Sequence, residues 1–207
     1  MNQTFDTIAT TDVTTRAVAA LSMNGFLPEV VATGADAFAR IKELIPAGVS
    51  VMNGASETLK QIGYIEYLTS GAHQWVNPKD AILKEEDKEK QDALRKQSVV
   101  SDWYLGSAHA VTESGELMFA SNSGSQLPHL VYTSPNIVLV VSTQKIVPNI
   151  AAGFERIDAH IVPLEDVRMM EAYKIHTTHA KTVILHEENP MMGRKVHVIF
   201  VKEKLGF

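Results

Sequence analysis

The chain has 207 residues, of which 45% are hydrophobic and 21% charged, and its formal net charge is −5. This length suits one large domain or two small ones, and the composition is that of an ordinary globular protein. The chain contains no cysteine, which excludes disulfides, thiolate nucleophiles and any cysteine-ligated iron–sulfur cluster within it.

The charge and the apolar pattern also bear on location. A mildly acidic chain has no overall attraction for nucleic acid or for an anionic membrane. No apolar run approaches the roughly 18 residues that indicate a membrane span, and the polar, acidic segment 1–12 does not resemble a signal peptide. We therefore expect a cytoplasmic protein that binds neither nucleic acid nor membrane.

The first helix is expected to begin near Thr11 and Asp12, both good helix caps, and to end at Asn24–Gly25. Residues 28–33 then read as a strand, and a helix capped by Asp36 runs to Pro46. A second strand follows at 49–52. Strand, helix and strand at this spacing predict a right-handed crossover and a parallel pair.

The most charged stretch is 79–97, where acidic and basic residues lie four positions apart in the favourable order. We expect one solvated helical arm, inserted into a single domain that spans residues 1–207. A docking arm for a partner protein is the alternative, because its centre has almost no apolar residues to bury.

The second half of the chain begins with three β-like segments at 102–105, 116–120 and 136–142, the last of which is the most apolar and is expected at the sheet centre. Helices are expected after Pro148 and from Pro163 to Tyr173. Segments 182–186 and 196–201 flank a turn and read as a C-terminal hairpin.

The first segment that could bind a ligand is 53–58 (NGASET), between a predicted strand and a short helix. Such a turn exposes backbone N–H groups at the positive end of a helix. We expect Gly54, Ser56 and Thr58 to contact an anion there. The alternative is that Ser56 only caps the helix. The segment lacks the Gly-Lys-Ser/Thr ending of a nucleotide-binding phosphate loop.

The second segment is a glycine turn at 112–116 followed by a small polar loop at 121–126. Glu113 is the candidate catalytic residue, since a carboxylate at a strand end can act as base, nucleophile or hydroxyl acceptor. The candidate ligand-binding residues of this segment are Gly115, Asn122, Gly124 and Ser125. The alternative is a plain hairpin followed by a helix cap.

The third segment is 143–149, at the end of the expected central strand. Ligands of open α/β sheets gather beyond the carboxyl ends of strands, and Lys145 would meet a phosphate or carboxylate as a point charge. The alternative is a surface lysine. The eight histidines form no convincing metal site, although His176 and His179 lie at i, i+3 and His109 lies close to Glu113.

Taken together, three stretches resemble the LUD domain family, named for lactate utilisation: 53–59 (NGASETL), 108–128 (AHAVTESGELMFASNSGSQLP) and 136–150 (NIVLVVSTQKIVPNI). The tail 198–207 resembles that of a stand-alone member. The resemblance implies a NagB/RpiA/CoA-transferase-like fold, which is a three-layer α/β/α sandwich with a mostly parallel central sheet. It also implies a link to bacterial oxidation of lactate to pyruvate. Without cysteines, the chain is similar to the small accessory branch, of the lactate utilisation protein C kind (formerly DUF162).

Three functions follow as hypotheses. The first is a non-redox accessory subunit that binds a small anionic ligand beside an iron–sulfur protein partner. The second is a stand-alone enzyme for a phosphorylated or CoA-linked molecule, with Glu113 as base or nucleophile. The third is a non-catalytic interaction module that docks through 79–97. A homodimer is compatible with each. The first two require segments 54–58, 121–125 and Lys145 to converge on one cleft.

Overall fold

The computed structural model describes residues 5–207, so the first four residues of the polar N-terminal segment lie outside the described part of the chain. Its centre is a five-stranded sheet in the order β1-β9-β6-β3-β2, and every pair of neighbours in it is parallel. The strands are β1 (Leu27–Val31), β2 (Val51–Asn53), β3 (Trp103–Gly106), β6 (Asn136–Ser142) and β9 (Lys195–Val201).

A second, four-stranded sheet has the order β7-β4-β5-β8. It consists of β4 (Ala110–Thr112), β5 (Leu117–Ser121), β7 (Ile146–Val147) and β8 (Lys181–Leu185). Strands β4 and β5 form an antiparallel hairpin, β8 pairs with β5, and β7 pairs with β4 in the parallel sense.

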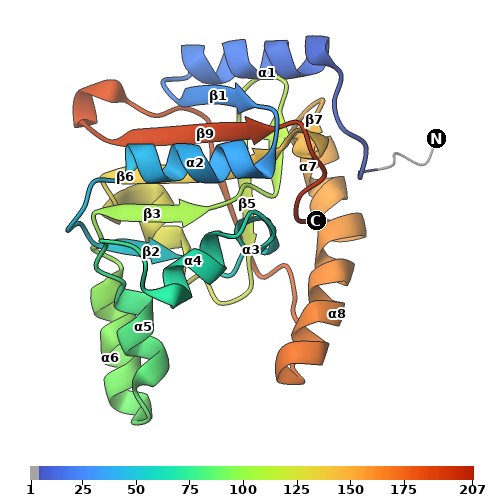
Figure 1. The fold of residues 1–207 in the computed structure, drawn as a ribbon. Coiled ribbons are helices and arrows are strands. Elements are labelled where there is room, and N and C mark those ends of the chain that lie inside the picture. The colour runs from blue at the N-terminus through green and yellow to red at the C-terminus, as the bar shows by residue number, and fades with distance from the viewer. Residues whose placement is uncertain (1–4) are drawn as a thin grey trace.

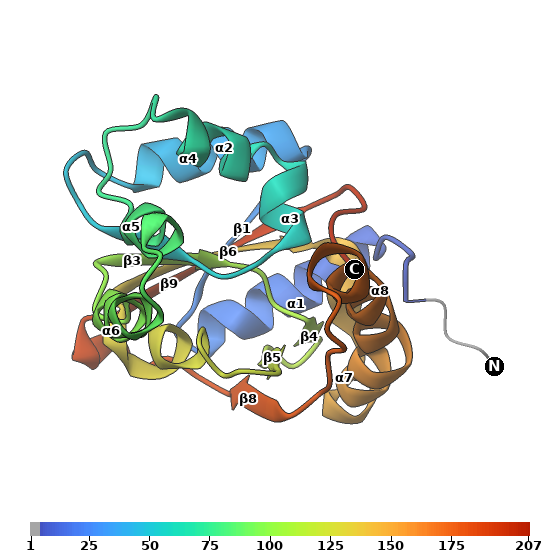
Figure 2. The same ribbon diagram turned by 90° about the horizontal axis from the view of Figure 1, so that it is seen from below.

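Helices cover the parallel sheet on one face, and a mixed layer covers it on the other. Figure 2 shows α2 (Gly34–Leu44), α3 (Glu57–Gln61) and α4 (Tyr64–Ser70) on one face, and α1 (Thr11–Met23) with the small sheet on the other. Alternation along β6 fits this arrangement: Val138 and Val140 pack with the α2–α4 layer, and Ile137, Leu139 and Val141 pack with the opposite layer. The three-layer sandwich with a mostly parallel sheet is confirmed.

The remaining helices lie at the sides of the sandwich. α7 (Ile150–Arg156) continues through a π-helical turn, Ile157–Ile161, into α8 (Val162–Tyr173). A second π-helical turn spans His129–Thr133, and short 3-10 turns span Thr143–Lys145 and Pro190–Met192. α5 (Pro78–Lys84) and α6 (Lys88–Ser98) project together from the body (Figure 1). Within residues 5–207, no helix has the length and apolar character needed to cross a membrane.

Several boundaries differ from the prediction for local reasons. The charged stretch 79–97 forms two helices rather than one, because Glu85 is extended and Asp87 starts a new helix as its N-cap. Thr33, not Asp36, caps α2, and Asp36 completes a capping box three residues later. Asn149 caps α7, so Pro148 lies before that helix. By contrast, β6 has the predicted bounds of 136–142.

The two C-terminal strands form close to where they were predicted, but they enter different sheets and do not pair with each other. β9 is buried over most of its length and lies between β1 and β6. β8 is half-exposed and lies at the edge of the small sheet. A strand with an almost continuous apolar run suits a position covered on both faces, which explains why β9 joins the central sheet.

The β4–β5 turn packs closely on α1 at Gly115, whose φ is +90°. A Cβ at this position would lie 2.8 Å from the carbonyl carbon of Ala20 and 2.9 Å from the amide nitrogen of Leu21. We expect Gly115→Ala to lower the free energy of unfolding by about 2 kcal/mol more than strain in the left-handed region alone, because the helix backbone must move. Urea denaturation measures this difference.

Gly48→Ala is the matched control. Gly48 has a similar φ of +82°, but a Cβ there would meet nothing within 4 Å. Its substitution should therefore cost only the strain, about 1 kcal/mol. Equal losses of unfolding free energy in the two variants would show that the β4–β5 turn does not pack against the α1 backbone as closely as described.

Candidate functional site

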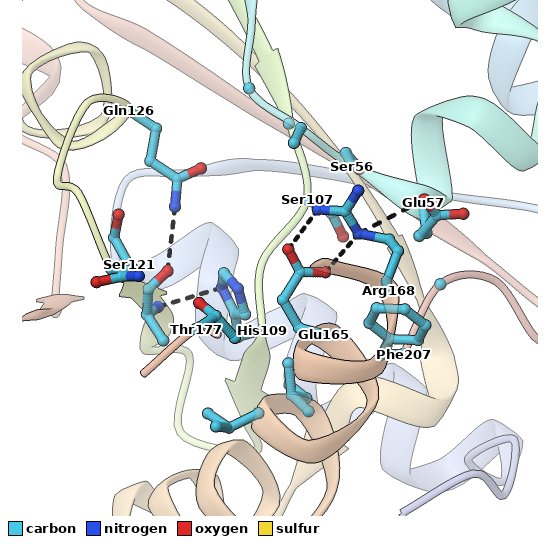
Figure 3. A pocket seen from close by; sticks show the side chains of 18 of the residues that line it. Ser56, Glu57, Ser107, His109, Ser121, Gln126, Glu165, Arg168, Thr177 and Phe207 are labelled. Carbon is cyan, nitrogen blue, oxygen red and sulfur yellow. Dashed lines mark hydrogen bonds and ion pairs between the residues drawn. The ribbon is translucent and has the colours of Figure 1, made fainter. Parts of the chain in front are cut away.

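A cavity of about 330 Å³ lies at the carboxyl edge of the parallel sheet (Figure 3). Its floor comes from the segments that follow β2, β3 and β6, and its walls come from the loop after β5, from α8 and from the segment before β8. This is where open α/β sheets bind ligands, because parallel strands bring the segments that follow them to one edge.

Lys145 lies at the floor of the cavity, three residues after β6. The Ser142 hydroxyl accepts from the Gln144 amide and turns the chain there. The Lys145 side chain is buried, with 4% of the residue exposed, and its Nζ donates to Thr58 Oγ1 and to Ser107 Oγ, each at 3.1 Å. Burial, and secondly the charge of Arg156, lower the pKa of Lys145 to about 7.

Arg156 of α7 is a second buried cation near this floor. It is 0% exposed, and within residues 5–207 its guanidinium donates to two carbonyl oxygens, those of His109 at 2.6 Å and of Phe5 at 3.3 Å. Its Nε has no partner in the described structure. Burial lowers the pKa of Arg156 to about 10, so it keeps its charge at neutral pH.

His109 lies between these groups and the small sheet. Its Nδ1 accepts from the Ala120 amide at 3.2 Å (Figure 3), so a neutral ring carries its proton on Nε2. Burial, and then the charges of Lys145 and Arg156, lower the pKa of His109 to about 3. The imidazole is therefore neutral at neutral pH and adds no charge to the site.

Two loops supply most of the small polar groups. The segment after β2 brings Gly54 and Ser56 to the cavity, and Lys79 of α5 fixes it by donating to the carbonyls of Asn53 and Gly54 at 3.2 and 3.4 Å. Ser56 also caps α3 by accepting from the Leu59 amide. Ser56 therefore caps the helix and also lines the cavity, and its contact with an anion stays a prediction.

The loop after β5 lines the opposite wall with Ser121, Asn122, Ser123, Ser125 and Gln126. Gly124, with φ of +86°, turns this loop, and its amide donates to Ser121 Oγ at 2.9 Å. Gln126 Nε2 donates to the Ala120 carbonyl (Figure 3). The wall is thus built from hydroxyl and amide groups without a charged side chain.

Helix α8 forms the mouth of the cavity. Arg168 donates to both carboxylate oxygens of Glu165, at 2.7 and 2.5 Å, and lies 3.9 Å from a carboxylate oxygen of Glu57 (Figure 3). Hydrogen bonding to Glu165 raises the pKa of Arg168. Unlike Lys145, this cation is already paired with carboxylates of the protein.

The structure brings most of the sequence-predicted ligand residues together. Gly54, Ser56, Thr58, Asn122, Ser125 and Lys145 all line the cavity. Gly124 shapes the loop beside it. Sequence reasoning missed Arg156, Ser107 and the α8 pair, although the i, i+3 spacing of Glu165 and Arg168 on a predicted helix was a signal for the last.

Two predicted residues lie elsewhere. Glu113 and Gly115 belong to the β4–β5 turn and do not line the cavity. The Glu113 carboxylate accepts from Arg16 of α1, at 2.6 and 2.8 Å. The reason is the direction of β4: the chain enters it from the cavity at Ala108 and His109, so its carboxyl end points away. β5 then runs back and delivers Ser121 to the site.

The histidines also occupy separate places. His176 pairs with Asp166 at 2.9 Å. His179 lines the cavity and lies 2.6 Å from Asp158. Among residues 5–207, no group of three or more histidine, aspartate or glutamate side chains could hold a metal ion.

The fold and the cavity define a three-layer α/β protein with a ligand-sized site at the carboxyl edge of its parallel sheet. The chain belongs to the LUD domain family, because the family model matches residues 14–201. It is similar to the crystal structure of a DUF162 family protein from Deinococcus radiodurans, with a TM-score of 0.57 and 11% sequence identity over 94% of this chain and 99% of that one. At this identity the likeness concerns the fold alone. A comparison with curated proteins gave no match.

The burial of Lys145 predicts a specific pH dependence of stability. Its pKa falls from 10.5 to about 7 on folding, so between these values the unfolded chain holds a proton that the folded chain does not. Wild-type stability should therefore rise with pH in this window, by up to about 1.4 kcal/mol per pH unit from this group. Below pH 7 both states are protonated and the contribution to the slope vanishes.

Lys145→Met removes this titration. We expect the variant to be more stable than the wild type at pH 6 to 7, and this advantage should shrink as the pH rises to 9. Urea denaturation across the range measures it, with Lys204→Met as the control because Lys204 is a largely exposed lysine. If the unfolding free energies of Lys145→Met and wild type change with pH in parallel, the lowered pKa of the buried Lys145 is contradicted.

Proposed function

We propose that the protein binds a small organic anion in the cavity and serves as a non-redox subunit in organic-acid utilisation. One observation carries the proposal: Lys145 and Arg156 are buried cations without a carboxylate partner among residues 5–207. Buried charges in proteins are normally paired, because taking a lone charge out of water costs several kcal/mol.

Lys145 lowers this cost by its lowered pKa, whereas Arg156 keeps its charge at neutral pH. The negative charge that balances the site would come from an ion of the solvent or from a ligand. The groups around Lys145 suit an anionic ligand, since the Thr58 and Ser107 hydroxyls and the serine-rich loop can donate hydrogen bonds to anionic oxygens. The neutral His109 ring adds a donor without adding charge. An anion at this place would raise the pKa of Lys145 and stabilise the folded chain.

The size of the cavity limits the ligand. A volume of about 330 Å³ is at the small end of the range for ligand pockets. It suits a hydroxy acid, an oxo acid or a small sugar phosphate. Of a CoA-linked molecule, only the acyl end would fit. Glu113 has no part in this proposal, since its carboxylate is paired with Arg16 outside the cavity.

The accessory role rests on family membership and on composition. The LUD domain is named for lactate utilisation, and this chain has no cysteine to hold an iron–sulfur cluster. A partner protein would then carry the electrons, and this chain would bind the organic acid or its product. Its cytoplasmic location is part of the same proposal.

A thermal-shift screen tests the binding. We expect anions of the hydroxy-acid, oxo-acid or sugar-phosphate classes to raise the melting temperature, while their uncharged analogues do not. A ligand at a hundred times its Kd adds about 2.7 kcal/mol of stability. Lys145→Met should weaken the binding by about tenfold to a hundredfold, the value of one charge-assisted hydrogen bond.

The control for this screen is Lys204→Met, which removes the same charge outside the cavity, where Lys204 lies 3.6 Å from Asp6. It should bind the anion as tightly as the wild type. Binding that both substitutions weaken equally would indicate general attraction between charges. If no anion of these classes shifts the melting temperature, the site is not an anion site and the proposal fails.

A further inference from the structure

The amine of Lys145 differs from that of a lysine that only neutralises a ligand. Such a lysine usually reaches a site from the surface on a hydrated side chain. Here the amine is at the floor of the cavity, and its two hydrogen-bond partners are hydroxyl oxygens of Thr58 and Ser107 rather than carboxylates. With these partners the nitrogen is stable as a neutral amine, because a hydroxyl can donate as well as accept.

The surroundings also hold the amine in one position. The segment Leu205–Gly206 passes over it, and Gln144 Nε2 donates to the carbonyls of both residues at 3.4 Å. Gly206 has a φ of +65°, and a Cβ there would lie 3.0 Å from Lys145 Nζ. The tail thus closes one side of the amine, while the cavity borders another.

From this geometry we infer that Lys145 is a nucleophile, which forms an imine with a small carbonyl compound that carries a negative charge, such as a 2-oxo acid. The inference rests on the proposed anion site and names the class of ligand that the site takes. It adds a covalent step that anion binding alone does not include.

The protonation state of the amine supports this step. With a pKa of about 7, roughly half of the Lys145 amines are neutral at pH 7, a fraction about a thousandfold larger than that of an ordinary exposed lysine. Glu57, Glu165, Arg168 and His179 also line the cavity, but each is paired with another side chain. The ionisable groups at the floor are Arg156 from α7 and His109 from the segment before β4. One is a cation and the other neutral, so neither holds the amine in its charged form.

The positive charge of a protonated imine is the reason to expect a carbonyl compound that carries a negative charge. A protonated imine keeps the positive charge of the lysine at a nitrogen that contacts no carboxylate of residues 5–207. The Glu57 and Glu165 carboxylates of the same cavity lie against Arg168. A carboxylate next to the carbonyl carbon would supply that charge within the ligand itself. An uncharged ketone of the same size would leave the cation unpaired, which is unfavourable in a buried site.

The step balances without an added oxidant or reductant. The nitrogen lone pair forms a bond to the carbonyl carbon, and the carbonyl electron pair moves to oxygen, which takes up a proton and gives a carbinolamine. The nitrogen lone pair then forms a second bond to carbon as the carbon–oxygen bond breaks, and the hydroxyl takes up one further proton and leaves as water. Both protons of this water come from the nitrogen of the neutral amine, and the product is the imine. The hydroxyls of Thr58 and Ser107, each 3.1 Å from the nitrogen, can pass these protons.

Reductive trapping tests the inference. The full-length protein is incubated with pyruvate, the smallest 2-oxo acid, and sodium cyanoborohydride, which reduces an imine to a stable amine. Peptide mapping by mass spectrometry should find the mass of the ligand less one oxygen atom on Lys145. At pH 7 we expect labelling there to exceed that of every other lysine by about tenfold or more, and to level off above pH 7.

The controls test separately the charge of the ligand, the identity of the reacting lysine and the folding of the variant. Acetone, an uncharged carbonyl of similar size, should label Lys145 at least about tenfold less than pyruvate, the value of roughly one unpaired charge contact. Lys145→Arg should abolish the adduct, and Lys204→Arg should keep it. Mapping the wild-type protein identifies the labelled lysine even if Lys145→Arg does not fold.

The outcomes distinguish this inference from the proposed function. If anions raise the melting temperature but neither pyruvate, glyoxylate nor ribose 5-phosphate labels Lys145, the imine is excluded and the anion site remains. Labelling confined to exposed lysines, or equal labelling by acetone, also overturns the inference. If no anion shifts the melting temperature either, the proposed function fails together with it.

Discussion

The parallel sheet imposes the constraint on which the site depends: β2, β3 and β6 all end at one edge, so the segments after them must meet there. The meeting point is closed by α3, α8 and the C-terminal tail, and it therefore takes the amine of Lys145 out of water. The lowered pKa of Lys145, the absence of a carboxylate contact to it within residues 5–207 and the reactivity proposed for its nitrogen all rest on this one placement.

The parts of the site that follow a strand directly were predictable from the sequence. Gly54, Ser56 and Lys145 come after short apolar runs that read as buried strands, and an α/β pattern brings the ends of such strands together. Arg156 was not predictable, because nothing in its own helix indicates that its guanidinium is buried against the His109 carbonyl, which is 47 residues away in sequence. The pairing of Arg168 with Glu57 is likewise a property of packing between distant segments.

The misplacement of Glu113 has a similar origin. A residue at a strand end was expected to face the ligand, but that rule applies to strands of the parallel sheet. Glu113 follows β4, which runs away from the cavity in the small sheet. Sequence pattern identifies a strand but not the sheet that it joins, and the same limit explains why β8 and β9 were paired in prediction. The sheet that β6 joins was easier to predict, because its continuous apolar run suits a strand that is buried on both faces.

The floor and the mouth of the cavity are built on different parts of the fold, and this affects which substitutions the protein can accept. The floor is built into the sheet and the core, where most substitutions disturb packing. The mouth is built on α8, which has no fully buried residue. Residues such as Met169 and Tyr173 contact the cavity without supporting the hydrophobic layers. Substitutions at these positions can therefore reshape the mouth of the cavity while the floor around Lys145 stays unchanged.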